Sequence, residues 1–96
     1  PRKFVIDFVG AQLEALPEDK TVEGVITVGP GAKFLEQQVY KNRVTGGWRL
    51  VFRVLPDEAL SADKDRSNTK DPVELRAFLK LGDEVLTETW SYAYEP

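Results

Sequence analysis

The sequence of 96 residues contains no histidine and no cysteine. Without histidine, no side chain has an ordinary pKa close to neutral pH, and the Ser–His relay of many hydrolases is excluded. Without cysteine, a disulfide framework and a thiolate metal site are excluded, although a reducing cytosol and a periplasm both tolerate cysteine-free domains. These two absences remove the groups that most often carry catalysis or bind metal.

Long apolar runs are also absent. No stretch approaches the roughly 20 residues that a membrane helix needs, and no basic-then-apolar leader is present. A net charge of −3 argues against nucleic acid as a partner, because nucleic-acid-binding domains are usually strongly basic. A hydrophobic content of 42% is ordinary for one soluble domain. Since the chain begins with Pro1 rather than Met, we expect residues 1–96 to be a single domain excised from a longer protein.

Positive charge is concentrated in residues 32–54. The cations there are Lys33, Lys41, Arg43, Arg49 and Arg53, and the one acid is Glu36. A solvated strand face is the simpler interpretation, because mixed charge is normal on protein surfaces. The alternative is a basic patch that meets an acidic partner or a neighbouring domain.

Apolar residues recur with a period of two along most of the chain, which predicts strands. The predicted strands cover residues 4–9, 21–29, 33–40, 48–54, 73–81 and 84–94. The first has apolar residues on both faces, so we expect it to be central or covered on both sides. The Gly82-Asp83 step predicts a tight hairpin turn, and one helical turn is expected around residues 12–16. About seven antiparallel strands at this spacing favour an all-β sandwich, with one long polar loop over residues 57–72.

Acidic chemistry has one candidate. Asp7 lies among apolar neighbours in VIDFV, which predicts a raised pKa. The alternative is a carboxylate at a strand edge that accepts hydrogen bonds from a nearby turn. Hydrolysis of a glycosidic bond needs a second carboxylate, for which no partner is evident. The polar run DKDRSNTKD lacks the spacing of a calcium loop. We therefore predict that this domain is not an enzyme and holds no metal or cofactor.

Aromatic residues allow two interpretations. Their rings form either a flat platform for sugar rings or part of the core between two sheets. We favour the core for Trp48, Phe52 and Trp90, and leave Tyr92 and Tyr94 open, because a terminal strand often has its last side chains at the rim. The candidates for contact with carbohydrate or with another domain are Trp48, Arg49, Arg53, Trp90, Tyr92 and Tyr94.

Three stretches together resemble a known family. They are RKFVIDFVG (residues 2–10), VTGGWRLVFRV (44–54) and PVELRAFLKLGDEVLTETWSYAY (72–94), in this order. The chain resembles the C-terminal domain of the periplasmic glucan biosynthesis proteins of the G and D type, which are involved in osmoregulated glucans. The segment 33–42 matches this pattern poorly, and the loop 57–71 is longer than expected.

The resemblance implies an immunoglobulin-like β-sandwich that follows a large N-terminal domain, a periplasmic location, and a role in making the β-1,2-linked glucan backbone or its branches. Some family members are similar to glycoside hydrolases, so the parent is expected to be a β-1,2-glucan-acting hydrolase or transglycosylase, with its acidic residues in the large domain. Two functions follow for this chain: an accessory domain that docks on the large domain, or an independent carbohydrate-binding module. An unrelated adhesion-type domain is a weaker third.

Overall fold

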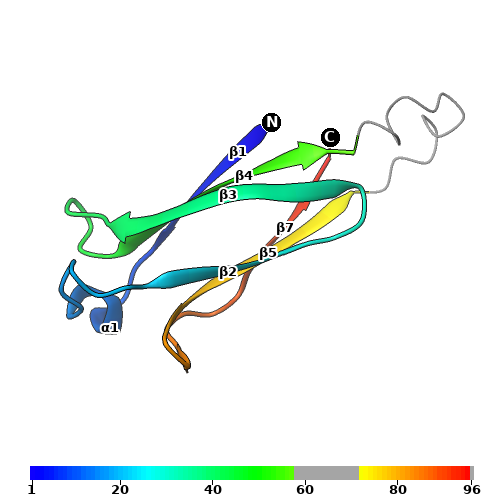
Figure 1. Cartoon of the computed structure of the whole chain (residues 1–96). Coiled ribbons are helices and arrows are strands. Elements are labelled where there is room, and N and C mark those ends of the chain that lie inside the picture. The colour runs from blue at the N-terminus through cyan, green and yellow to red at the C-terminus, as the bar shows by residue number, and fades with distance from the viewer. Residues whose placement is uncertain (58–71, 96) are drawn as a thin grey trace, which may run out of the picture.

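Two antiparallel sheets face each other in this chain (Figure 1). A computed structural model describes residues 1–57 and 72–95, and these contain seven strands. In the first sheet the order is β1 (Arg2–Phe8), β4 (Trp48–Pro56) and β3 (Ala32–Lys41). In the second sheet β5 (Val73–Leu81) lies between β2 (Glu23–Val28) and the pair β6 (Glu84–Val85) and β7 (Trp90–Tyr94). The predicted all-β, immunoglobulin-like sandwich of about seven antiparallel strands is confirmed.

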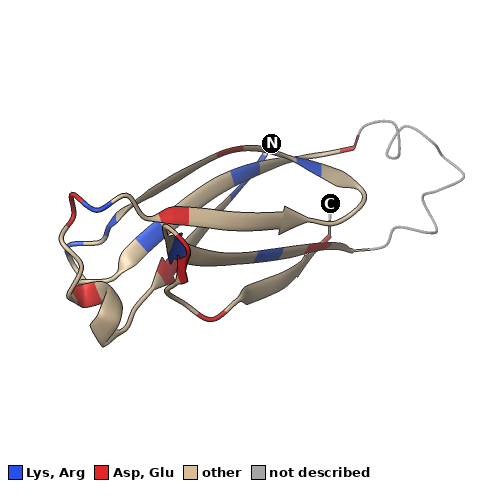
Figure 2. Ribbon diagram, turned by 60° about the horizontal axis from the view of Figure 1, so that its bottom comes forward, with Lys and Arg blue, Asp and Glu red and all other residues tan. Residues whose placement is uncertain are grey.

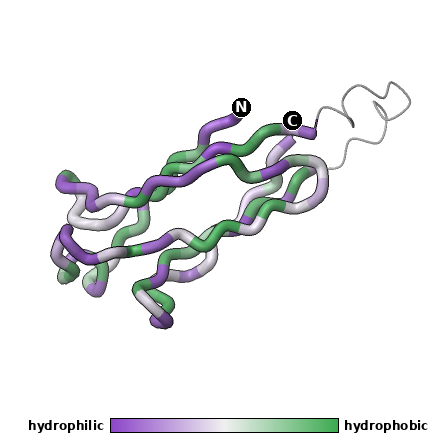
Figure 3. The backbone as a smooth tube through the Cα atoms, in the orientation of Figure 1, coloured by the Kyte–Doolittle hydropathy of each residue, from purple (hydrophilic) through white to green (hydrophobic). Residues whose placement is uncertain are grey.

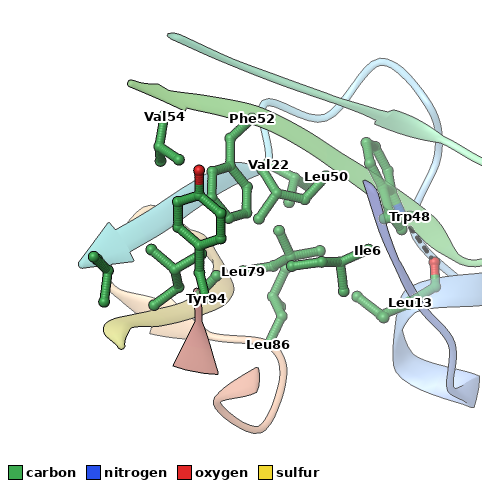
Figure 4. Packing of buried hydrophobic residues seen from close by; sticks show 13 residues of the cluster. Ile6, Leu13, Val22, Trp48, Leu50, Phe52, Val54, Leu79, Leu86 and Tyr94 are labelled. Carbon is green, nitrogen blue, oxygen red and sulfur yellow. Dashed lines mark hydrogen bonds between the residues drawn. The ribbon is translucent and has the colours of Figure 1, made fainter. Parts of the chain in front are cut away.

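The core lies between β4 and β5. Every second residue of each strand is buried, as the period of two predicted. These residues are Trp48, Leu50, Phe52 and Val54 in β4, and Val73, Leu75, Ala77 and Leu79 in β5. Hydropathy along the backbone follows this arrangement, with apolar segments on the strands of both sheets (Figure 3). Figure 4 shows these side chains meeting between the sheets.

A single helical turn, α1 (Ala11–Glu14), connects β1 to the segment before β2, as expected. Its carbonyl groups are bound by side chains of the first sheet. The Lys41 ammonium donates to the carbonyl oxygens of Leu13, Glu14 and Leu16 at 3.2, 2.9 and 2.6 Å. The Trp48 indole N–H also donates to the Leu13 carbonyl, at 3.1 Å (Figure 4). These bonds satisfy carbonyls that so short a helix cannot pair internally, and they fix α1 against β3 and β4.

Strand β1 differs from its prediction. Within residues 1–57 and 72–95 it has one neighbouring strand, β4, so it lies at an edge of the first sheet rather than at its centre. Phe4, Ile6 and Phe8 point inward, whereas Val5 is 50% exposed and Val9 is also exposed. The apolar residues on the second face of this strand are therefore uncovered in the described structure.

The closing hairpin also differs from its prediction. Gly82 has φ +60°, as the tight turn requires, and Leu81 pairs with Glu84. The predicted continuous strand over residues 84–94 is nevertheless interrupted. Lys80 pairs with Val85 and Ala77 with Trp90, so residues 86–89 lie opposite only residues 78–79. The extra residues form a bulge that separates β6 from β7. The predicted loop over residues 57–72 falls largely on residues 58–71, which lie outside the described residues.

The free edge of β2 is covered by one side chain of the other sheet. The Gln37 amide nitrogen donates to the Gly24 carbonyl, and the Gly24 N–H donates to the Gln37 amide oxygen, both at 3.0 Å. The side chain thus replaces the backbone of a neighbouring strand. A Cβ atom at position 24 would lie 2.7 Å from Leu50 Cδ1 and 2.8 Å from Gln37 Oε1, so only glycine leaves room for this contact.

We predict that Gly24→Ala lowers the free energy of unfolding by about 1–3 kcal/mol, because the added methyl group overpacks this site. Urea denaturation followed by tryptophan fluorescence measures the change. Thr27→Ala, at an exposed position of the same strand, is the control and should cost less than about 1 kcal/mol. Equal stability of Gly24→Ala and the unchanged chain would contradict the close approach of the two sheets.

Candidate functional site

The predicted contact residues separate into buried and surface positions. Trp48 is 2% exposed and Tyr94 is 4% exposed, so both belong to the core and offer no ring face to a ligand or a second domain. They lie at different places in the core: Trp48 beside Leu13, and Tyr94 beside Phe52 and Val54 (Figure 4). Trp90 is partly buried and Tyr92 is 47% exposed. The structure therefore leaves Trp90 and Tyr92 as the accessible rings of the predicted set.

Five aromatic rings close the side of the sandwich between β1 and β7. We call this cluster of Phe4, Phe52, Trp90, Tyr92 and Tyr94 the aromatic wall. The centroid of the Phe4 ring lies 5.3–6.3 Å from those of the other four rings. The Trp90 and Tyr92 rings are nearly parallel, with an interplanar angle of 16° and a centroid distance of 5.9 Å. Because most of these rings pack on one another, the wall is mainly a structural contact between the sheets.

Phe4 was not singled out from the sequence as a member of this cluster. It contacts rings on both β4 and β7, and the Arg2 guanidinium lies 5.8 Å from its centroid. Its inward position in the alternation of β1 was visible in the sequence. The sequence does not show that β1 and β7, which belong to different sheets, meet at one side of the sandwich.

The outer face of the first sheet carries the two predicted arginines. The strand register places Arg49 of β4 between Asp7 of β1 and Tyr40 of β3. Two residues further along β4, Val51 lies beside Val5 of β1. Arg49 donates to both Asp7 carboxylate oxygens, at 2.7 and 3.1 Å. We use the name outer face for Val5, Asp7, Tyr40, Arg49, Val51 and Arg53. The side chains of Arg49 and Asp7 are each more than one-third exposed, so this pair lies at the surface.

The positive charge of residues 32–54 is largely neutralised within the chain, which favours the simpler interpretation of a solvated face over a basic patch. Arg53 pairs with Glu36 at 2.7 Å and Arg43 with Glu18 at 2.9 Å. Arg49 is paired with Asp7, and Lys41 is bound to backbone carbonyls. Figure 2 shows acidic and basic segments interspersed along the strands. The arginines of this segment therefore lie on a surface where acids of the same chain pair with them.

Of the two interpretations of Asp7, the raised pKa is wrong and the alternative is confirmed: Asp7 lies on β1, at the edge of the first sheet as described, and accepts a hydrogen bond from Asn42 at the start of the turn after β3. The hydrogen bond from the Arg49 guanidinium is the largest influence and lowers the pKa of the Asp7 carboxyl. Burial opposes it, and the bond from the Asn42 amide and the charge of Arg49 lower the pKa further. Asp7 in turn raises the pKa of Arg49. The neighbours Ile6 and Phe8 point inward, away from Asp7, whereas Val5 and Val9 are exposed and do not enclose it. The group opposite Asp7 on β4 is an arginine. An ionised Asp7 cannot donate the proton that glycosidic cleavage requires.

Two open grooves lie at the end of the sandwich that carries α1. The first, of about 450 Å³, lies between the end of β1 with α1 and the bulge before β7, and we call it the α1 groove. It is lined by residues 8–13 and 86–90. The second, of about 550 Å³, is lined by residues of the 18–22 segment together with β3, Arg43 and Trp48. The α1 groove was not predicted from the sequence. It depends on the bulge, and the alternation of Leu86, Thr87 and Trp90 indicates a continuous strand instead.

No group of three or more acidic residues within residues 1–57 and 72–95 is arranged to hold a metal ion. No helix in the same ranges has the length and apolar content needed to cross a membrane.

We predict that Asp7→Asn flattens the acid side of the stability profile. Because the pKa of Asp7 is lower in the folded chain, its ion pair stabilises the fold above the unfolded-state pKa of about 4, and this contribution is lost as the pH falls through the folded-state pKa. The variant should have a slightly lower urea midpoint at pH 7, since solvent screens this surface pair, and the difference should close below about pH 3. Asp83→Asn, in the exposed hairpin turn, is the control of equal charge change. Parallel profiles for Asp7→Asn and the unchanged chain would contradict the assignment.

Comparison with known protein families gives a match that supports the resemblance seen in the sequence. The profile of the family described as periplasmic glucan biosynthesis protein, MdoG, matches residues 1–94. This match spans nearly the whole chain, including all three stretches that carry the resemblance, and it gives the chain a periplasmic location. The chain belongs to the periplasmic glucan biosynthesis protein family.

Proposed function

We propose that residues 1–96 form a non-catalytic, C-terminal accessory domain of a periplasmic glucan biosynthesis protein. The domain docks on the large N-terminal, sugar-processing domain of the same protein through its outer face. The observation that carries this proposal is the apolar row of Val5 and Val51, in which Val5 is half exposed and Val51 partly buried. Arginines that ion pairs already hold in place flank this row. The family match supports a role in glucan synthesis.

The chemistry of the outer face suits a contact between domains. Interfaces within a chain resemble transient interfaces and are more polar than a domain core. Arginine and tyrosine are enriched in interfaces, because both combine an apolar body with a polar end. Arg49 and Tyr40 lie side by side here, and Val5 is half exposed beside them. Since Asp7 and Glu36 orient the arginines before docking, little side-chain entropy is lost on association.

The absence of catalysis is supported by the state of Asp7. Glycoside hydrolysis needs one carboxylic acid that donates a proton and a second carboxylate at a defined separation. Asp7 is paired with Arg49 and has a lowered pKa, which suits it to orient the arginine rather than to act as an acid. On this proposal the reactive carboxylates belong to the large domain, and this chain contributes position and contact.

An independent carbohydrate-binding module is the second candidate. The near-parallel rings of Trp90 and Tyr92 favour it, because a flat pair of rings suits a pyranose face. Trp90, however, also packs on Phe4 and Phe52, which leaves Tyr92 as the ring with the larger free surface. A wide aromatic platform of the predicted four rings is therefore less well supported than docking by the outer face.

We predict that the separately produced large domain binds the isotope-labelled 96-residue chain at the outer face. Backbone amide signals of Val5, Tyr40, Arg49 and Val51 should shift or broaden on addition of the large domain. Val5→Glu should weaken binding by about fivefold or more, because it places a charge in the apolar row. Val44→Glu introduces the same charge at a position that is 94% exposed, in the turn after β3, and should leave binding unchanged.

Perturbations confined to other faces, or equal losses for the two glutamate variants, would exclude the outer face as the docking surface. A complete lack of binding when the two parts are mixed, together with independent unfolding of the two parts in the full-length protein, would exclude docking itself.

A further inference from the structure

We propose that the α1 groove binds a short segment of neutral glucan and thus provides a sugar subsite on this domain. The site is distinct from the outer face and differs from a flat aromatic platform. One wall is formed by the end of β1 and by α1, and the other by the bulge and Trp90. Its volume of about 450 Å³ lies in the usual range for small-molecule sites.

The groove offers both kinds of contact that a sugar ring needs. Phe8 and Trp90 are partly exposed aromatic residues that line the groove. The C–H face of a pyranose is attracted to the negative face of such rings. Gln12 and Thr89 add an amide and a hydroxyl group for hydrogen bonds with sugar hydroxyls; one N–H of the Gln12 amide donates to Glu84, which leaves its oxygen and its second N–H for a ligand. The Thr87 hydroxyl is already engaged, because it accepts from the Leu79 N–H and donates to the Glu88 carbonyl. Aromatic and hydroxyl-binding groups therefore converge on one concave surface.

The bulge adds backbone groups to this surface. Residues 86–89 have no partners in the register of β5 with β6 and β7. Two hydrogen bonds still tie the segment to β5: Leu86 N–H donates to Leu79 O at 2.8 Å, and Leu79 N–H donates to Thr87 Oγ1 at 3.0 Å. The segment is thus held in place while the backbone of residues 87–89 lies outside the ladder. The Glu88 carbonyl accepts from the Thr87 hydroxyl at 2.9 Å, and the other backbone groups of residues 87–89 are open to solvent or to a ligand.

The opposite wall is fixed from behind. Lys41 and Trp48 hold the carbonyl of Leu13, and the Gln12 amide donates to Glu84 at 3.0 Å, from α1 to β6. A Cβ atom at Gly47 would overlap the Phe8 carbonyl, so the turn after β3 lies directly against the end of β1. Both walls are therefore positioned before a ligand enters, which reduces the ordering cost of binding.

The charge of the groove selects among ligands. The residues that line it, all within the described ranges, include one carboxylate, Glu88, and no lysine or arginine. Glu84 lies near its edge through the bond to Gln12. A phosphate or uronate would meet negative charge without a cation to balance it, so a neutral sugar is favoured. The chain belongs to a glucan biosynthesis family, so among neutral sugars a glucan is the ligand that we expect the protein to meet.

The test is an amide-shift titration of the isotope-labelled 96-residue chain with linear β-1,2-linked glucose oligosaccharides, up to about 10 mM. We expect saturable shifts at Gln12, Thr87, Thr89 and the Trp90 indole N–H. Gln12→Ala and Trp90→Phe should each weaken binding by about three- to tenfold, as loss of a hydrogen bond or of part of a ring contact does. Alanine is a good helix former and phenylalanine retains an aromatic ring in the wall, so both variants are expected to keep the fold.

Gln38→Ala makes the same chemical change at an exposed position of β3 and should leave binding unchanged. Oligogalacturonate of equal length should not bind. The proposal is overturned by a flat response at the highest glucan concentration, by shifts centred on Tyr92 and Phe4 instead, or by an equal loss of affinity in Gln38→Ala and Gln12→Ala. Because the large domain is absent from this titration, its result is independent of the docking proposal.

Discussion

The structure depends on the face-to-face packing of β4 and β5. Each strand gives every second residue to one core, and these residues are almost completely buried. Such packing leaves little freedom in how the two sheets lie on each other, because protein interiors contain few voids. It also determines what remains for the surface. The alternate residues of β4, Arg49, Val51 and Arg53, must point outward, and they make up the centre of the outer face.

The edges of the two sheets are closed in three different ways. Gln37 pairs with the backbone of Gly24 and covers the free edge of β2. The aromatic wall closes the side between β1 and β7, with Phe4 touching rings from both sheets. The edge of β5 is shared by β6 and β7, which the bulge separates. A side chain therefore replaces backbone pairing at the edge of β2, and aromatic side chains close the side between β1 and β7. At the edge of β5, the break between β6 and β7 creates the α1 groove.

The features that could be predicted from the sequence are those set by local alternation. The period of two located the strands and the inward face of Trp48 and Phe52, and the Gly82-Asp83 step located the hairpin. The misplaced features depend on pairing between distant residues. Asp7 and Arg49 are 42 positions apart, so the cause of the lowered pKa of Asp7 is not visible in VIDFV. In the same way, the alternation through residues 86–90 continues across the bulge, because a bulge changes the register without changing the apolar pattern.

The two proposed surfaces share strand β1. Val5 and Asp7 point outward into the outer face, whereas the end of the same strand at Phe8 forms a wall of the α1 groove. A strand of seven residues transmits position well, since β4 pairs with it along its whole length. A domain docked on the outer face therefore fixes the direction in which the groove opens. An accessory domain that binds sugar weakly by itself gains by this arrangement, because a glucan already bound to the large domain reaches a second contact without a further loss of translational freedom.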